Sequence, residues 1–161
     1  MIVLITGVAG SGKTTIGRRL ATELGWSYHE ADDFHSAANK AKMASGVPLD
    51  DTDRAPWLAA IHAAMADCVR RGESAVFTCS ALKESYRRVL ADGLPALKLV
   101  FLTGARALLE QRLQARPGHY MKAGMLDSQL AILEPPADAL TLEVRQTPAA
   151  LVADIRRALA L

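Results

Sequence analysis

Eight residues near the N-terminus combine glycines, a lysine and a threonine at a spacing that suits phosphate binding. Residues 7–14 read GVAGSGKT, which fits the P-loop pattern G-x-x-x-x-G-K-S/T at every fixed position. Glycines let the backbone curl so that successive N–H groups point at phosphate oxygens. Lys13 adds a positive charge for the β- and γ-phosphates, and Thr14 supplies a hydroxyl for Mg²⁺. A plain turn needs neither side chain, so the sequence predicts a nucleoside triphosphate site at Gly7, Val8, Ala9, Gly10, Ser11, Gly12, Lys13, Thr14 and Thr15.

The segments on either side of this loop have the periodicity that such a site requires. An apolar run over residues 1–5 indicates a buried strand, and Ile16, Leu20 and Leu24 recur at helical spacing after the loop. A helix in that place directs the positive end of its dipole at the bound anion. The motif alone does not say whether water or a second substrate receives the phosphoryl group.

Further along the chain, apolar strand patterns alternate with helical ones. This alternation predicts an α/β fold with a parallel sheet covered on both faces. We expect a three-layer P-loop NTPase fold, similar to the nucleotide kinases, with about five strands and a small lid near residues 116–126. The predicted strands are 2–6, 26–30, 75–78, 97–102 and 141–144, and the predicted helices are 13–24, 37–44, one capped by Asp53 that ends near 71, 82–90, 105–116 and 149–161.

Ionisable residues gather after the predicted strands. In open α/β sheets ligands bind beyond the carboxyl ends of the strands, so these residues are expected around one site. A second substrate site beside the phosphate loop follows from this clustering. The residues concerned are Glu30, Asp32, Asp33 and His35 after the second strand, Cys79, Ser80 and Lys83 after the third, and Arg112, Arg116 and His119 after the fourth strand and its helix.

Asp32 is the candidate base for an acceptor hydroxyl, because a carboxylate that takes the proton assists phosphoryl transfer. The alternative is that Asp32 only caps the next helix, although Asp33 and Ser36 are also suited to that. No aspartate ends the third strand, where a metal-binding carboxylate would be expected, and Phe77-Thr78-Cys79 stands there instead. Asp32 is therefore a candidate base, a holder of a water on Mg²⁺, or both.

Arg112 and Arg116 lie four residues apart and so share one helix face, just before a Pro-Gly break. Arginines at such a place can close over the transferring phosphate, which is worth about 10³–10⁵ in rate where it occurs. The alternative is ordinary helix-surface charge. We expect Lys13, Asp32, Arg112 and Arg116 to be catalytic.

Composition excludes several other classes of function. The chain has 161 residues, which fits one domain over 1–161, and a net charge of +2 with no basic tract, so nothing indicates a nucleic-acid partner. The sequence shows no export signal and no apolar run long enough to span a membrane. Neither export nor membrane insertion is therefore expected. Two cysteines, Cys68 and Cys79, without metal-site spacing suit a reduced, cytoplasmic setting.

Several blocks of residues resemble the bacterial gluconokinases. Together with the P-loop, these blocks occur in the same order as in the family and extend to about residue 136. Related P-loop kinases share the P-loop but lack the Cys-Ser-Ala-Leu-Lys and Gly-His-Tyr blocks. The chain departs from the family's Asp-Gly-Asp at Glu30-Ala31-Asp32, and has Ser36 and Lys122 in place of prolines. The blocks are Asp32-Asp33-Phe34-His35, Asn39, Lys42-Met43, Gly46-Val47-Pro48-Leu49, Asp53-Arg54, Pro56-Trp57-Leu58, Cys79-Ser80-Ala81-Leu82-Lys83, Tyr86-Arg87, Gly118-His119-Tyr120, Ser128-Gln129 and Leu133-Glu134-Pro135.

The resemblance implies that ATP phosphorylates the 6-hydroxyl of D-gluconate, giving 6-phosphogluconate, and it suggests a homodimer. A carboxylate substrate calls for the planar donor fork of arginine, for which Arg54 and Arg87 are the candidates. Two other readings stay open here: a kinase for shikimate or for nucleoside monophosphates, and a nucleotide-binding module without turnover. The expected substrate-binding residues are Asp32, His35, Arg54, Lys83, Arg87 and His119.

Overall fold

Five parallel strands form the central sheet of the computed structural model, which describes residues 1–115 and 122–161. The strand order is β2-β3-β1-β4-β5, and each neighbouring pair is parallel. The predicted α/β class and parallel sheet are therefore confirmed, with all five strands within a few residues of their expected places. The strands are β1 Ile2–Thr6, β2 Ser27–Glu30, β3 Ala75–Thr78, β4 Leu97–Thr103 and β5 Leu140–Glu143.

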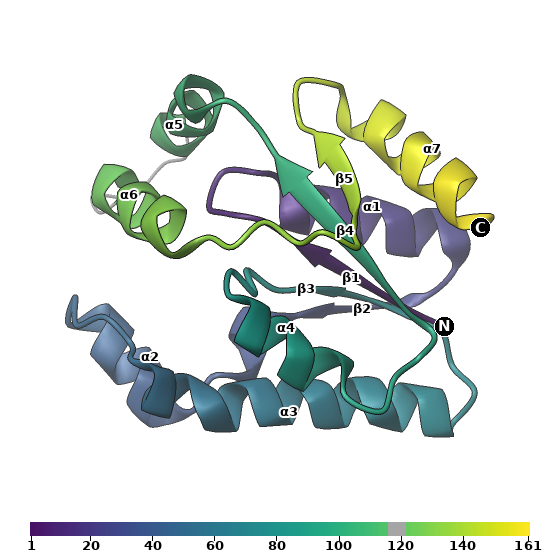
Figure 1. The fold of residues 1–161 in the computed structure, drawn as a ribbon, viewed down its shortest axis with the longest axis horizontal. Coiled ribbons are helices and arrows are strands. Elements are labelled where there is room, and N and C mark those ends of the chain that lie inside the picture. The colour runs from purple at the N-terminus through teal and green to yellow at the C-terminus, as the bar shows by residue number, and fades with distance from the viewer. Residues whose placement is uncertain (116–121) are drawn as a thin grey trace.

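Helices cover both faces of the sheet (Figure 1), which is why all of β1 and β3 is buried. On one face α1 (Lys13–Leu24) and α7 (Pro148–Leu159) enclose a core with Val3, Ile5 and Leu20 at its centre. On the other face α3 (Asp51–Arg70) and α4 (Glu84–Ala91) enclose a core around Ile61, Phe77 and Leu90. The other helical elements are a 3₁₀ helix, η1 (Ala31–Phe34), and α2 (Ala37–Ala44), α5 (Arg106–Gln114) and α6 (Lys122–Ile132).

The pair α5 and α6 and the short α2 lie on the side of the sheet toward which the strand arrows point (Figure 1). The carboxyl ends of the strands, the phosphate loop and the polar segment after β2 therefore face the same region. This placement agrees with the expectation that ligands bind at that end of the sheet. None of the described helices is long and apolar enough to cross a membrane.

Two helix predictions need correction. Asp53 does not cap α3: Asp50 is the cap, and Asp53 is the third helical residue of a capping box, in which each side chain accepts a hydrogen bond from the other's backbone N–H. Both acidic residues fit a helix start, and only the backbone geometry distinguishes them. The helix α6 was not expected at all, because residues 116–126 were interpreted as a lid from the Pro-Gly break.

Candidate active site

The phosphate loop joins β1 to α1 and has the backbone that an anion cradle requires. Gly7, Gly10 and Gly12 all have positive φ angles, of 147°, 80° and 89°. A Cβ atom at Gly7 would lie only 2.6 Å from the Leu102 carbonyl oxygen and 2.8 Å from Ser11 Oγ. Only glycine fits that position, and its lack of a side chain lets the loop turn tightly at the carboxyl end of β1. The helix α1 starts at Lys13, so the N–H groups of its first turn lie at the loop.

Polar atoms inside the loop suit a triphosphate. Ser11 Oγ is buried, and within residues 1–115 and 122–161 it has no hydrogen-bond partner. Lys13 Nζ donates to the Val8 carbonyl oxygen at 3.1 Å, so the ammonium group lies across the loop. Ala9 N–H donates to Gln129 Oε1 of α6 at 2.6 Å, which ties that helix to the loop. Donors of both backbone and side chain therefore gather where phosphate oxygens are expected.

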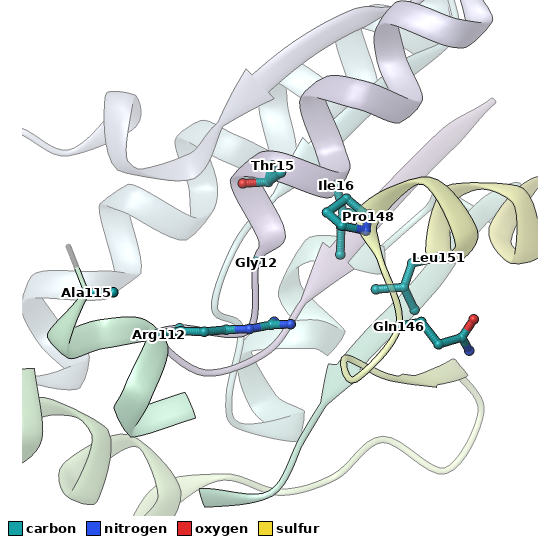
Figure 2. Close-up of a pocket in the computed structure, with 9 residues that line it drawn as sticks. Gly12, Thr15, Ile16, Arg112, Ala115, Gln146, Pro148 and Leu151 are labelled. Atoms are coloured by element: carbon teal, nitrogen blue, oxygen red, sulfur yellow. The ribbon is translucent and has the colours of Figure 1, made fainter. Parts of the chain in front are cut away.

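A pocket of about 340 Å³ lies beside the loop (Figure 2). The start of α1 forms one wall, α5 another, and the segment between β5 and α7 a third. Arg112 extends from α5 toward Gly12, and its guanidinium donates to the Val144 carbonyl oxygen. The residues that line the pocket are Gly10, Gly12, Thr15, Ile16, Arg112, Ala115, Gln146, Pro148 and Leu151.

The expectation that Arg112 closes over the transferring phosphate stays a prediction, and this position suggests a second role. The side chain forms a wall of a pocket next to the phosphate loop and is held by a backbone carbonyl, which suits the nucleoside part of the donor. Arginine can stack its planar guanidinium on an aromatic base. We therefore propose that Arg112 binds the nucleotide.

Glu30 was expected near the site without a role of its own, and the structure places its carboxylate at the phosphate loop. Thr14 Oγ1 donates to Glu30 Oε2 at 2.9 Å. No cluster of three or more His, Cys, Asp or Glu side chains that could hold a metal occurs among the described residues. A Mg²⁺ ion held mainly by phosphates and water fits this arrangement, with Thr14 as a ligand and Glu30 behind it. In the sequence analysis Asp32 was the one candidate both for the base and for a group beside Mg²⁺. With Glu30 at Thr14, Glu30 suits the role beside the metal, and Asp32 suits the role of base.

Asp32 lies in η1, directly after β2. The residue stays exposed, but the surrounding protein removes enough water to raise the pKa of its carboxyl, and the nearby Glu30 charge raises it further. Electrostatic interactions with His35 and Lys13 oppose this shift. Ser36 caps α2 by accepting the Asn39 N–H. The cap of α2 therefore does not need Asp32, which favours the functional interpretation of this carboxylate.

His35 stacks on Trp57, with ring centroids 4.4 Å apart and planes within 8°. Trp57 Nε1 in turn donates to the Ala31 carbonyl oxygen at 2.7 Å, which fixes η1 against α3. Burial lowers the pKa of His35, so its imidazole is neutral at neutral pH. Its Nδ1 is buried without a hydrogen-bond partner in the described part of the chain, and it is suited to a substrate hydroxyl.

A second cationic group comes from α3 and the start of α4. Arg54 Nη1 donates to the Tyr86 hydroxyl at 3.3 Å, and Lys83 Nζ lies 5.3 Å from the centre of the Tyr86 ring. Asp51 receives hydrogen bonds from both Lys83 and Tyr86 and lies 3.8 Å from Arg54. Ala81, just before Lys83, has a φ of 40°, a strained value for alanine that shapes this turn. The structure thus brings Arg54 and Lys83 together, as expected.

Arg87 is not with them. It is 8% exposed, and its guanidinium donates to the carbonyl oxygens of Ala81, Leu82 and Glu134 at 2.7–3.0 Å. These contacts join the turn after β3 to the segment that follows α6. We therefore assign Arg87 a structural role and leave it out of the proposed substrate site.

Cys79, which follows the third strand, is fully buried, which raises the pKa of its thiol to about 12, so it is a neutral core residue. Arg116 and His119 lie outside the described residues. So does most of the segment that was expected to form a lid.

Comparison with known proteins shows the family of this chain. A family model described as an AAA domain matches residues 2–136. The chain is 50% identical over 137 residues to a gluconokinase of Gluconobacter oxydans (strain 621H), covering 84% of this chain and 76% of that protein. It is 38% identical over 156 residues to the thermoresistant gluconokinase of Escherichia coli (strain K12), covering 94% and 89%.

Among solved structures, a gluconokinase from Sinorhizobium meliloti 1021 superposes with a TM-score of 0.88 at 39% identity, covering 98% of this chain and 90% of that chain. The two proteins are therefore similar in both sequence and structure over most of their length. The P-loop kinase fold expected from the sequence is confirmed. This chain belongs to the gluconokinase family.

Proposed function

We propose that this chain transfers the γ-phosphoryl group of ATP to the 6-hydroxyl of D-gluconate, giving 6-phosphogluconate and ADP. The observation that carries the proposal is a series of interacting ionisable groups from the phosphate loop to the second cationic group, that of Arg54 and Lys83. Asp32 interacts electrostatically with both His35 and Lys13, and His35 also interacts with Arg54. Family membership supplies the acceptor for this arrangement, since the relatives above are gluconokinases.

The donor occupies the phosphate loop and the pocket beside it. We assign the phosphates to the backbone N–H groups of residues 7–15 and to Lys13, and the nucleoside to the pocket walled by Arg112 and Pro148. Mg²⁺ is assigned to the Thr14 hydroxyl, with Glu30 holding that hydroxyl from behind. When bound, the ion neutralises negative charge on the β- and γ-phosphates.

The acceptor is assigned to the region between Asp32 and the cationic group of α3 and α4. Gluconate carries its carboxylate at one end and the 6-hydroxyl at the other, so the two ends need different partners. Arg54 and Lys83 suit the carboxylate, whereas Asp32 suits the hydroxyl, with His35 as a donor or acceptor for hydroxyls between them.

The chemical step is one displacement at phosphorus. The 6-oxygen forms a bond to the γ-phosphorus, the bond from that phosphorus to the β,γ-bridging oxygen of ATP breaks, and ADP leaves. Asp32 takes the proton of the 6-hydroxyl, a transfer for which its raised pKa is favourable. Lys13 offsets the negative charge on the phosphates at the loop.

An acceptor panel tests this function. Purified protein with Mg·ATP is assayed for ADP release against gluconate, other sugar acids, shikimate and nucleoside monophosphates. We expect gluconate to be preferred, and a Lys13→Met variant to fold but lose turnover. ADP release that is independent of gluconate, or a preference for shikimate, would contradict the proposal. The cytoplasmic location and the homodimer stay predictions.

A further inference from the structure

Three hydroxyl groups converge on the carboxylate of Glu30. Besides the bond from Thr14, the Tyr28 hydroxyl donates to Glu30 Oε2 at 2.5 Å, and Thr78 Oγ1 donates to Glu30 Oε1 at 2.8 Å. The hydroxyls of Tyr28 and Thr78 also lie 2.9 Å from each other. Both carboxylate oxygens are therefore held, and one of them is shared between the phosphate loop and β2.

The sheet and α1 are built so that these groups meet. Tyr28 and Glu30 are two residues apart on β2 and so point to the same face, and Thr78 on β3 is the direct register partner of Glu30. The helix α1 packs on that face at Gly17, where a Cβ atom would lie 2.6 Å from Thr78 Cγ2 and 2.9 Å from Tyr28 Cε2. Thr14 lies three residues before Gly17, on the same side of the helix. The close approach at Gly17 thus brings the Thr14 hydroxyl to Glu30.

The direction of the Thr14 hydrogen bond matters for a metal ion. A hydroxyl has one hydrogen, and a cation binds its oxygen lone pairs, so the hydrogen must point away from the ion. Glu30 accepts that hydrogen in this structure. If the Glu30 carboxylate rotated freely, its oxygen would accept the Thr14 hydrogen only part of the time. The bonds from Tyr28 and Thr78 hold it in one orientation.

We propose that Tyr28 and Thr78 are positioning residues for the metal–nucleotide complex: their hydroxyls orient Glu30, and Glu30 orients the Thr14 hydroxyl toward Mg²⁺. The proposal rests on the assignment of a metal–nucleotide to the phosphate loop. It does not depend on gluconate. Partners behind a metal ligand commonly change metal affinity about 10–100-fold when they are removed.

Calorimetric titration with ADP, once with excess Mg²⁺ and once with EDTA, tests it. Tyr28→Phe removes the hydroxyl but keeps the ring that packs at Gly17, and Thr78→Val is nearly isosteric. We expect each variant to bind Mg·ADP about 10-fold more weakly than the wild type, while the affinity for metal-free ADP stays the same. The double variant should lose little more than either single variant, because both act on one carboxylate. Thr141→Val, the same change at an exposed position of β5, is the matched control and should bind as the wild type does.

Three results would overturn the proposal. Equal weakening with and without Mg²⁺ would mean that the substitutions distort the loop in general. Unchanged affinity in both titrations would mean that the hydroxyls only satisfy buried polar groups. If the wild type bound ADP equally well with and without Mg²⁺, the metal ion would not contribute to nucleotide binding, and Thr14 would need no orientation toward it. Because no acceptor is present in the titration, a failure of the gluconate assignment would leave these results unaffected and would be detected separately by the acceptor panel.

Discussion

Lys83 Nζ lies 3.1 Å from both carboxylate oxygens of Asp51, which joins the N-cap of α4 to the first residue of α3. The pKa of Asp51 is lowered, first by the hydrogen bond from Tyr86 and then by that from Lys83. The Asp51 side chain is 65% exposed, so an ion pair here adds little to stability. Its effect is to hold three donors, those of Arg54, Lys83 and Tyr86, in one place.

Lys83→Met should therefore affect the acceptor rather than the fold. We expect the KM for gluconate to rise about 10-fold or more, since one charge-assisted bond to a carboxylate is worth roughly 1.5–3 kcal/mol. The KM for ATP and the melting temperature should stay close to those of the wild type. Lys98→Met, an exposed lysine near the start of β4, is the matched control. A rise in the KM for ATP instead would move Lys83 to the donor side.

Asp32→Asn should lower activity while stabilising the protein. Loss of the base is expected to reduce kcat about 10²–10⁴-fold. The raised pKa means that the fold favours the neutral carboxyl: that contribution to stability is fully present below the unfolded-state pKa and is lost as pH rises through the folded-state pKa. Asparagine is neutral at every pH, so its melting temperature at pH 7 should exceed that of the wild type. A variant that melts lower at pH 7 would contradict this argument.

The same shift predicts the acid side of the pH profile. Because Asp32 must be ionised to accept a proton, kcat/KM should fall on the acid side with an apparent pKa above that of an ordinary aspartate. Asp32→Glu changes the length of the side chain and should shift this limb. If the acid side of the kcat/KM profile were unchanged in Asp32→Glu, another group would be responsible for it.

Arg112→Met separates the two roles considered for this arginine. As a wall of the pocket beside Gly12 it should raise the KM for ATP, while the KM for gluconate and kcat at saturating ATP change little. Arg106→Met is the control on the same helix, since Arg106 pairs only with the half-buried Glu110 and the exposed Asp127 in the described contacts. A large loss of kcat at saturating ATP would instead restore the role over the transferring phosphate.

The sequence was informative where function depends on local pattern. The loop from Gly7 to Thr14 needs its residues in order along the chain, so its prediction followed from one short segment. Asp32 and Lys83 followed from a general rule, that the carboxyl ends of parallel strands share one side of the sheet. Their grouping with the loop needed only a parallel sheet, which the alternation of strands and helices predicted.

Other assignments depended on contacts between distant segments. The role of Glu30 arises because Gly17 lets α1 approach β2 and β3 closely, and no local pattern reports that approach. Arg87 has the same residue type as Arg54, and only the fold turns its donors toward three backbone carbonyls. A buried arginine and a substrate-binding arginine are therefore indistinguishable by residue type alone.

Arg87→Met tests this reassignment. The substitution removes the donors to the Ala81 and Glu134 carbonyl oxygens and one of two donors to that of Leu82, which also accepts the Glu134 N–H at 2.9 Å. We expect the free energy of unfolding to fall by about 3 kcal/mol, which corresponds to a decrease in melting temperature of roughly 6–12 °C for a chain of this size. Arg88→Met, the exposed neighbour on α4, should change stability by less than about 0.5 kcal/mol. Assayed well below the melting temperature, Arg87→Met should raise the KM for gluconate less than Lys83→Met does. A variant that keeps its melting temperature but shows a large rise in that KM would return Arg87 to the substrate site.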